Sequence, residues 1–131
     1  MVDNRLLAQG VNPATTSYSY NANADLASYT YPNGVVTAYS YDGLDRLFRV
    51  ASSKSGSLTN FTYTFGAAWN RTAVSELGGR NVAYGYDDVY RLASEAITAD
   101  PGSNNGTVSY SYDSVGNRTA MTSTLNAVPG D

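Results

Sequence analysis

The sequence predicts an all-β fold in which tandem β-hairpins lie side by side in an antiparallel sheet. Three observations predict it. Pairs of aromatic residues spaced two apart recur about every 23 residues along the 131-residue chain, and such a period is typical of arrays of small structural repeats. Large and small residues alternate around each pair, as they do in a β-strand. Turn-forming Gly, Pro and Asn residues separate the segments.

The aromatic pairs mark five outgoing strands. They are Tyr18 and Tyr20, Tyr39 and Tyr41, Tyr63 and Phe65, Tyr84 and Tyr86, and Tyr110 and Tyr112. The repeats therefore start near residues 16, 37, 61, 82 and 108. Residues 3–20 read as the return strand of a preceding repeat, at Arg5–Gln9, followed by the next aromatic pair. We therefore expect residues 1–131 to form a single array of about five and a half repeats.

The two faces of these strands differ in bulk. Between and beside the aromatic residues lie small side chains: Ser17, Ser19, Ala38, Ser40, Thr62, Thr64, Ala83, Gly85, Ser109 and Ser111. A lone hairpin is marginally stable in water, so each hairpin must be held by its neighbours. Because the chain has 12 tyrosines and few large aliphatic residues, we expect stacked tyrosine rings to form the core of the sheet.

A turn follows each aromatic pair. Asp42, Asp87 and Asp113 can accept hydrogen bonds from main-chain N–H groups two residues on, which favours a type I turn. Gly116 suits the left-handed conformation that closes such a turn, and Asp45 tolerates it. Trp69 and Tyr90, at the equivalent place, adopt that conformation less readily, so we expect their two turns to be built differently. The predicted return strands are 46–52, 71–77, 91–98 and 118–125.

The composition excludes most catalytic chemistry. The chain has no His and no Cys, so it has no imidazole base, no thiolate nucleophile and no His/Cys metal site. The formal charge of -3 lacks the positive field that holds nucleic acid. Neither a signal peptide nor a long apolar segment is present, so we expect no membrane insertion. The sequence therefore predicts a protein that is not an enzyme and that binds neither cofactor nor metal.

The recurring charged residues permit other interpretations. The carboxylates Asp42, Asp45, Asp87, Asp88 and Asp113 could form an acid–base pair or a calcium site, but their recurrence at one turn position favours capping of the main chain. The arginines Arg46, Arg71, Arg91 and Arg118 could bind an anionic partner. We instead expect each to pair with a turn aspartate of an adjacent repeat.

The segments YSYDGLDRL, YGYDDVYRL and SYSYDSVGNRT resemble the YD-repeat, or Rhs-repeat, family. The similarity extends over nearly the whole chain, although FGAAWNR and YNANADL lack the aspartate. The resemblance implies a ribbon of hairpins that winds in a spiral, as in Rhs polymorphic toxins, insecticidal toxin complexes and teneurins, where the repeats build a large hollow shell. In this family the expected fold is therefore a spiralling antiparallel sheet, either an open arc of a shell or a stack like a β-solenoid.

These observations predict a non-catalytic structural module that forms part of an extracellular shell or scaffold, outside or on the surface of a bacterial cell. Its expected partners are further YD repeats of the same chain or identical copies that pair head to tail. Two alternatives remain. One is a self-assembling extracellular filament whose open edge strands pair with neighbouring copies. The other is a carbohydrate-binding module whose tyrosine rings stack on sugars.

Overall fold

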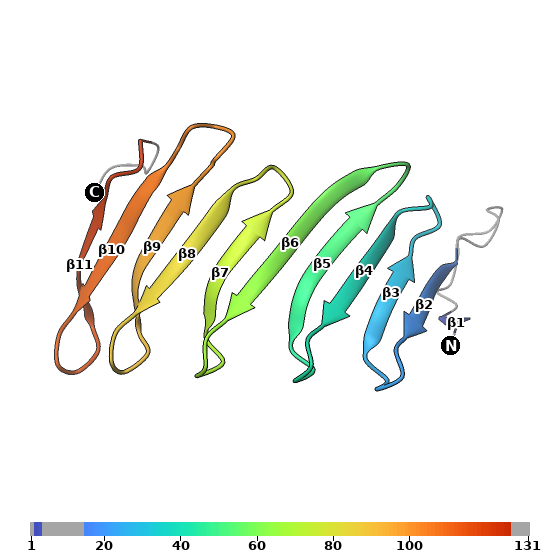
Figure 1. The fold of residues 1–131 in the computed structure, drawn as a ribbon, viewed down its shortest axis with the longest axis horizontal. Helices are drawn as coiled ribbons and strands as arrows, with labels where there is room; N and C mark the ends of the chain where they lie inside the picture. Colours follow the sequence, from blue (N-terminus) through green and yellow to red (C-terminus); the bar gives the residue numbers. More distant parts are fainter. Residues whose placement is uncertain (1, 4–14, 127–131) are drawn as a thin grey trace, which may run out of the picture. The chain divides into compact units, whose positions relative to one another are not determined.

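A computed structural model describes residues 2–3 and 15–126, and these residues form strands and turns only (Figure 1). The strands are β1 (Val2–Asp3), β2 (Thr16–Tyr20), β3 (Leu26–Thr30), β4 (Val36–Tyr41), β5 (Leu47–Ser53), β6 (Ser57–Phe65), β7 (Arg71–Glu76), β8 (Asn81–Tyr86), β9 (Leu92–Thr98), β10 (Gly106–Tyr112) and β11 (Arg118–Ser123). Their order in the sheet is their order in the chain. The predicted all-β fold of tandem antiparallel hairpins is confirmed.

The chain divides into two compact units, Met1–Phe61 and Thr62–Asp131, called here the N-terminal and C-terminal units. The boundary falls inside β6. The predicted return strands coincide with β5, β7, β9 and β11 to within two residues at either end. The return strand expected at Arg5–Gln9 lies outside the described residues. Among the described residues, no helix is long and apolar enough to cross a membrane.

Polar side chains occupy the centre of the N-terminal unit. The register places Tyr29 opposite Tyr18 on one side and opposite Thr37 on the other, and Thr37 lies opposite Ser52. Thr37 is only 4% exposed, and its hydroxyl shares a hydrogen bond of 2.9 Å with the Ser52 hydroxyl. This bond satisfies two polar groups that would otherwise be costly to bury.

Aliphatic side chains occupy the corresponding face of the C-terminal unit. Val82 lies opposite Val74 in β7 and opposite Ile97 in β9. Together with Val108 of β10, these residues are between 3% and 9% exposed and make up the buried hydrophobic set of the described chain. The expectation that stacked tyrosine rings form the core is therefore wrong for this unit. The rings of Tyr84 and Tyr110, two residues further along the strands of Val82 and Val108, are only half-buried.

The other face of the sheet carries small side chains, as expected. Ser17, Ser19, Ala83, Ser109 and Ser111 are all exposed. The Ser19 hydroxyl shares a hydrogen bond of 2.8 Å with the hydroxyl of Ser28 across the β2–β3 hairpin. This thin polar face needs no covering layer to remain in water.

A β-bulge recurs near the start of the return strands. In the β4–β5 hairpin, Ser40 pairs with Arg49 and Tyr41 with Leu47, which leaves Phe48 as an extra residue. The same shift leaves Ala27, Ala93 and Thr119 as extra residues in β3, β9 and β11. Such bulges increase the local twist of a strand. The extra residues are two alanines, a phenylalanine and a threonine, so no single residue type marks the bulge in the sequence.

Candidate functional site: the repeated turn edge

Five turns of identical length follow the outgoing strands, two in the N-terminal unit and three in the C-terminal unit, and within each unit they lie at one edge (Figure 1). They are residues 21–25, 42–46, 66–70, 87–91 and 113–117, and we number their residues 1 to 5. The N–H of position 1 donates to the carbonyl of position 5 at 2.9–3.0 Å, and the N–H of position 4 donates to the carbonyl of position 1 at 2.9–3.2 Å. All five turns therefore share one main-chain hydrogen-bond pattern, a type I turn closed by a left-handed residue.

Position 4 has a positive φ in every turn. The values are 68° for Ala24, 56° for Asp45, 66° for Trp69, 61° for Tyr90 and 96° for Gly116. The prediction that the turns of Trp69 and Tyr90 are built differently is therefore wrong. The two main-chain hydrogen bonds and the flanking strands impose the conformation, and a bulky residue accepts a strained backbone there.

An Asp or Asn side chain caps four of the five turns. At position 1, one Oδ1 atom accepts hydrogen bonds of 2.8–3.1 Å from the N–H groups of positions 3 and 5 in the turns of Asn21, Asp42, Asp87 and Asp113. The remaining turn has Gly66 there, and a Cβ atom at Gly66 would come within 2.8 Å of Asn70 Oδ1. The aspartates therefore act within their separate turns.

These hydrogen bonds stabilise the charged form of the carboxyl groups. The pKa of Asp87 is lowered chiefly by the N–H of Arg91, and the pKa of Asp113 chiefly by the side-chain amide of Asn117. For Asp42, partial desolvation opposes the shift, but the N–H of Leu44 and the guanidinium of Arg46 outweigh it and lower the pKa. All three carboxyl groups are thus ionised at neutral pH.

Position 5 completes the cap. Arg46 Nε and Arg91 Nε donate to the second carboxylate oxygen of Asp42 and Asp87 at 2.8 and 2.6 Å. Asn117 Nδ2 donates to Asp113 at 2.9 Å. The prediction that arginines pair with aspartates of adjacent repeats is wrong, because positions 1 and 5 flank the same turn, whereas the next turn lies two strand spacings away, about 10 Å.

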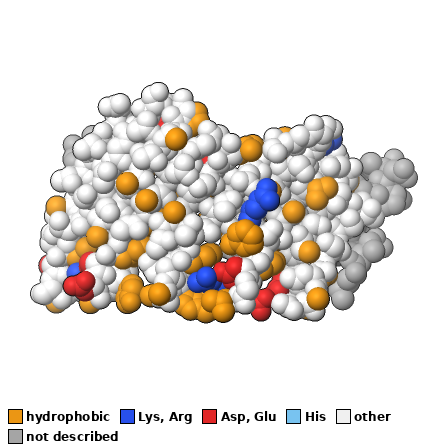
Figure 2. All heavy atoms as spheres, viewed as in Figure 1, with side chains coloured by type: hydrophobic (Ala, Val, Ile, Leu, Met, Phe, Trp, Pro, Cys, Tyr) orange, Lys and Arg blue, Asp and Glu red, His pale blue; other side chains and the backbone are white. Residues whose placement is uncertain are grey.

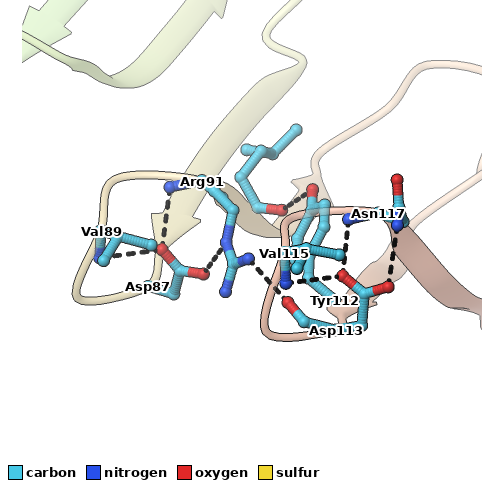
Figure 3. A network of polar contacts seen from close by, with 8 residues as sticks. Asp87, Val89, Arg91, Tyr112, Asp113, Val115 and Asn117 are labelled. Carbon is cyan, nitrogen blue, oxygen red and sulfur yellow. Dashed lines mark hydrogen bonds and ion pairs between the residues drawn. The ribbon is translucent and has the colours of Figure 1, made fainter.

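Arg91 also reaches the next turn, but through the main chain (Figure 3). Its Nη1 donates to the carbonyl oxygen of Asp113 at 3.1 Å, and its guanidinium lies 4.7 Å from the centre of the Tyr112 ring. In the N-terminal unit, Asn23 Nδ2 joins two successive turns by donating to Asp45 Oδ1 at 2.8 Å. Neighbouring turns are thus linked along the edge in both units.

The tyrosine that precedes the turn ties its hairpin to the preceding one. Its hydroxyl donates to the carbonyl of the first residue in the previous return strand: Tyr41 to Leu26 at 3.0 Å, Tyr86 to Arg71 at 2.7 Å and Tyr112 to Leu92 at 2.7 Å. Phe65, at the same position, has no hydroxyl. Sequence reasoning missed these ties, although the choice of Tyr over Phe before the turn was a signal for them.

The other two predicted arginines contact aromatic rings. Arg71 lies 5.5 Å from the centre of the Tyr63 ring and 5.0 Å from that of Tyr84, and Arg118 lies 5.7 Å from the centre of Tyr110. These are cation–π distances. Tyr110 also donates to Glu95 Oε1 at 2.7 Å, and this hydrogen bond raises the pKa of Tyr110. Tyrosines therefore alternate with the charged residues Arg71, Glu95 and Arg118 along this face of the C-terminal unit.

Tyrosine rings contact one another directly in the N-terminal unit. The Tyr29 ring centre lies 6.1 Å from Tyr18, 6.0 Å from Tyr39 and 4.8 Å from Tyr31. The Tyr31 hydroxyl donates to that of Tyr29 at 3.2 Å. Hydrogen bonds from Thr37 and Tyr31 lower the pKa of Tyr29, and the bond to Tyr29 raises the pKa of Tyr31. The rings meet at interplanar angles of 42° to 85°, so the tyrosines of this unit contact one another in tilted and edge-on arrangements and not as a face-to-face stack.

No cluster of three or more His, Cys, Asp or Glu residues that could hold a metal ion occurs in the part of the chain that the structure describes. The predicted site residues instead form hydrogen bonds, ion pairs and ring contacts between hairpin turns and strands. Such an arrangement stabilises a repeating sheet, with its charged groups distributed over successive turns.

Residues 20–58 match the family model described as the RHS Repeat. The chain contains an Rhs repeat. The matched segment begins at Tyr20 and includes the complete Asp42–Arg46 turn with its ion pair. The resemblance to YD/Rhs repeats is therefore confirmed, and this repeat is a structural module. No curated protein sequence matches the chain.

Several solved structures share the fold. The chain superposes on one from a TcdB2–TccC3–Cdc42 crystal structure with a TM-score of 0.78, 20% identity, and 95% of this chain and 8% of that chain covered. For the Photorhabdus luminescens Tc holotoxin pore the TM-score is 0.74, with 20% identity and coverage of 88% and 6%. For TcdB2–TccC3 it is 0.73, with 20% identity and coverage of 89% and 6%. The chain spans less than a tenth of each of these proteins.

Proposed function

We propose that this chain is a non-catalytic stretch of wall in an extracellular shell or scaffold of bacterial origin. The proposed role of the chain is to hold its hairpins side by side in a fixed order, so that the sheet can enclose or display other parts of an assembly. The partners are further YD repeats, in the same polypeptide or in other copies. The spiral winding and the single-array organisation over residues 1–131 belong to this proposal.

The observation that carries the proposal is the tyrosine tie between neighbouring hairpins. Tyr86 and Tyr112 each donate a hydrogen bond of 2.7 Å to a carbonyl in the preceding return strand. The sheet ladder between β9 and β10 covers Ser94–Ile97 and Gly106–Ser109, and the tie from Tyr112 to Leu92 joins the same two hairpins beyond that ladder, next to their turns. The similarity of fold to proteins of multi-subunit toxin complexes further supports a role in assembly.

Removing the two hydroxyls tests this role. Tyr86→Phe/Tyr112→Phe should lower the free energy of unfolding by about 1–3 kcal/mol, since an intramolecular hydrogen bond contributes about 0.5–1.5 kcal/mol. Thermal and urea unfolding followed by circular dichroism measure the change. Tyr90→Phe is the matched control, because the Tyr90 side chain is exposed at a turn tip. Equal stabilities for the double variant and the control would contradict the proposed role of the ties.

Glycan binding is a second candidate, favoured by the exposed rings of the N-terminal unit. Tyr18 is 39% exposed and Tyr31 43% exposed, and both contact Tyr29. Exposed aromatic rings can stack on sugar rings. Tyrosine fluorescence titrated with a panel of neutral glycans should change in the wild type and not in Tyr18→Ala/Tyr31→Ala. A flat response of the wild type across the panel excludes this candidate.

Filament formation through edge strands is the third candidate. β11 pairs with β10 on one side, and its other side pairs with no strand of the described chain. An open strand edge is a template for pairing with another chain. Because the N–H of Thr124 donates to Thr107 in β10, the alternation of an antiparallel ladder directs the N–H of Ser123 to the open side. Ser123→Pro would therefore remove one main-chain donor from the open edge of β11. If strand pairing builds filaments, electron microscopy should show fibres for the wild type and fewer for this variant. Discrete particles at high concentration exclude the candidate.

A further inference from the structure

Segments of two tyrosines with one residue between them occur five times in the chain. They are residues 18–20, 29–31, 39–41, 84–86 and 110–112, and we call them the Tyr-x-Tyr segments. Side chains two residues apart on a strand point to the same face, so the two tyrosines of each segment start from the same local geometry. What their rings contact depends on the fold around them, and here the five segments differ.

The rings of Tyr29 and Tyr31 contact each other directly. Their centres lie 4.8 Å apart at an interplanar angle of 85°, and the Tyr31 hydroxyl donates to the Tyr29 hydroxyl at 3.2 Å. Among the described residues, no other Tyr-x-Tyr segment has a ring contact between its own two tyrosines. Edge-on contact at this distance is favourable between aromatic rings, so the fold itself holds these two phenols together.

Three of the other segments direct their tyrosines to other groups. The hydroxyls of Tyr41, Tyr86 and Tyr112 donate to main-chain carbonyls of the preceding return strands. The rings of Tyr84 and Tyr110 lie beside the guanidinium groups of arginines. The hydrogen bonds hold the second ring of each segment toward the preceding hairpin. Residues 29–31 are thus distinguished by the structure and not by the sequence spacing.

Solvent reaches this pair of tyrosines. Tyr31 is 43% exposed and Tyr29 is half-buried, with the rings of Tyr18 and Tyr39 at 6.1 and 6.0 Å from the Tyr29 ring. By contrast, hydrophobic side chains are scattered over β2–β5 on the face of the molecule that Figure 2 shows. The tyrosine rings are therefore concentrated at one accessible place, where a reagent that attacks Tyr31 finds a second phenol in contact with it.

Two phenols in contact are suited to oxidative coupling. A one-electron oxidant removes one electron and one proton from each phenol and leaves two phenoxyl radicals. The radicals join by a bond between ring carbons next to the hydroxyl groups, and the hydrogens on those carbons move as protons to the two oxygens. The product, dityrosine, therefore has two hydrogen atoms fewer than the two tyrosines.

The arrangement of Tyr29 and Tyr31 is close to that of this product. In dityrosine the two hydroxyl groups flank the new bond and lie near each other, as they do in this pair. The bonded rings are twisted about that bond, and the rings of the pair lie at 85°. Hydrogen bonds from Thr37 and Tyr31 also lower the pKa of Tyr29, so the proton that must leave with the electron is held less tightly. Reacting groups that a fold holds in near-product geometry couple far faster than groups that must diffuse together.

We propose that Tyr29 and Tyr31 form a modification site at which a one-electron oxidant, such as a haem peroxidase with hydrogen peroxide, makes a dityrosine cross-link within the chain. The peroxide takes up the two electrons and two protons that leave the phenols and becomes two molecules of water. The cross-link joins the end of β3 to the first residue of the loop 31–35 and fixes the two rings against each other. This inference goes beyond the proposed function, since a wall of hairpins needs no covalent link.

Oxidation of the purified chain by a haem peroxidase and hydrogen peroxide tests the proposal. At low protein concentration, the product should be a monomer that shows dityrosine fluorescence and has lost the mass of two hydrogen atoms. Tandem mass spectrometry should find no backbone fragments from either side of Thr30, because the cross-link closes a ring around it. Tyr29→Phe and Tyr31→Phe should each lower the yield of cross-linked monomer by about ten-fold or more, since phenylalanine forms no phenoxyl radical and the remaining tyrosines are not held for coupling.

The segment 18–20 provides the matched control. Tyr18 and Tyr20 are 39% and 56% exposed and have the same spacing in the sequence, but their rings are not in contact with each other. Tyr20→Phe should therefore leave the yield of cross-linked monomer unchanged. A native product without the 29–31 link, a link at 18–20 in equal yield, dityrosine confined to dimers, or undiminished coupling in Tyr31→Phe would overturn the proposal. None of these results affects the tyrosine ties, whose removal is measured by stability and tests the wall function separately.

Discussion

The N-terminal and C-terminal units use the same turn but different residues to hold their strands together. In the N-terminal unit the buried centre is the hydrogen-bonded pair Thr37 and Ser52 beneath a cluster of tyrosine rings. In the C-terminal unit it is a row of branched aliphatic side chains that includes Val82 and Ile97. The turn determines where a hairpin ends and which residues face one another. Given that geometry, the buried face of the sheet can be held together either by hydrogen-bonded polar side chains or by aliphatic side chains.

The links between turns differ in the same way. The N-terminal unit joins two turns by an amide-to-carboxylate bond from Asn23 to Asp45. The C-terminal unit uses a guanidinium that reaches a main-chain carbonyl, from Arg91 to Asp113. Because a main-chain carbonyl is present whatever the sequence, the second kind of link tolerates more variation in the next repeat. Degenerate repeats can therefore share one geometry.

The largest expected effect comes from the aliphatic row. Ile97→Ala should lower the free energy of unfolding of the C-terminal unit by about 2–4 kcal/mol, because it removes buried methyl groups and leaves a cavity. Hydrogen exchange resolved by mass spectrometry, with urea unfolding alongside, measures the effect unit by unit. Val115→Ala, at an exposed turn tip, is the control. A loss below about 1 kcal/mol would show that the row contributes little to stability.

The polar centre of the N-terminal unit should respond differently. Ser52→Ala removes one of the two hydrogen bonds of the buried Thr37 hydroxyl, leaves the bond to Tyr29, and should cost about 0.5–1.5 kcal/mol. Thr37→Val/Ser52→Ala removes both hydroxyl groups and should recover most of that loss, since the Tyr29 hydroxyl keeps its hydrogen bond to Tyr31. Urea unfolding of the three proteins gives both values. A double variant that is less stable than Ser52→Ala would mean that the Thr37 and Ser52 hydroxyl groups stabilise the fold beyond satisfying each other's hydrogen bonds.

Acidification should destabilise the chain through the carboxylates of its turns, and not through the buried residues of either unit. The pKa values of Asp42, Asp87 and Asp113 are lowered by hydrogen bonds in the folded chain. Their contribution to stability is therefore complete above the unfolded pKa, about 3.9, and is lost as the pH falls through the lower folded pKa. The urea midpoint should fall on acidification below about pH 4, and less steeply in Asp42→Asn/Asp87→Asn/Asp113→Asn. Equal slopes for the two proteins would contradict the assignment.

Much of the local structure could be predicted from the sequence. The two-residue alternation located the strands because side chains of a strand point to alternate faces. Asp42 and its equivalents located the turns because their carboxylates satisfy main-chain N–H groups close in sequence. Both signals are local, and both are visible in a single repeat.

The errors and omissions concern contacts between repeats and the backbone geometry of the turn. Burial of Val82 and Ile97 depends on the register between strands, which no single repeat reveals. The positive φ of Trp69 follows from the hydrogen bonds of its turn, which override residue preference. Arg91 binds Asp87 because the turn brings positions 1 and 5 together, a geometry that sequence spacing alone did not show. The tyrosine ties require neighbouring hairpins to be in place before the hydroxyl has an acceptor.

The central claim is that each hairpin is held by the one before it, and the hydrogen exchange of Tyr112→Phe tests it most directly. Tyr112 lies in β10, and its hydroxyl bonds to the carbonyl of Leu92 at the start of β9. Without the hydroxyl, amides of β9 should exchange faster along with those of β10 and β11, whereas Tyr90→Phe should leave all three strands unchanged. Faster exchange confined to β10 and β11, or none at all, would contradict the claim.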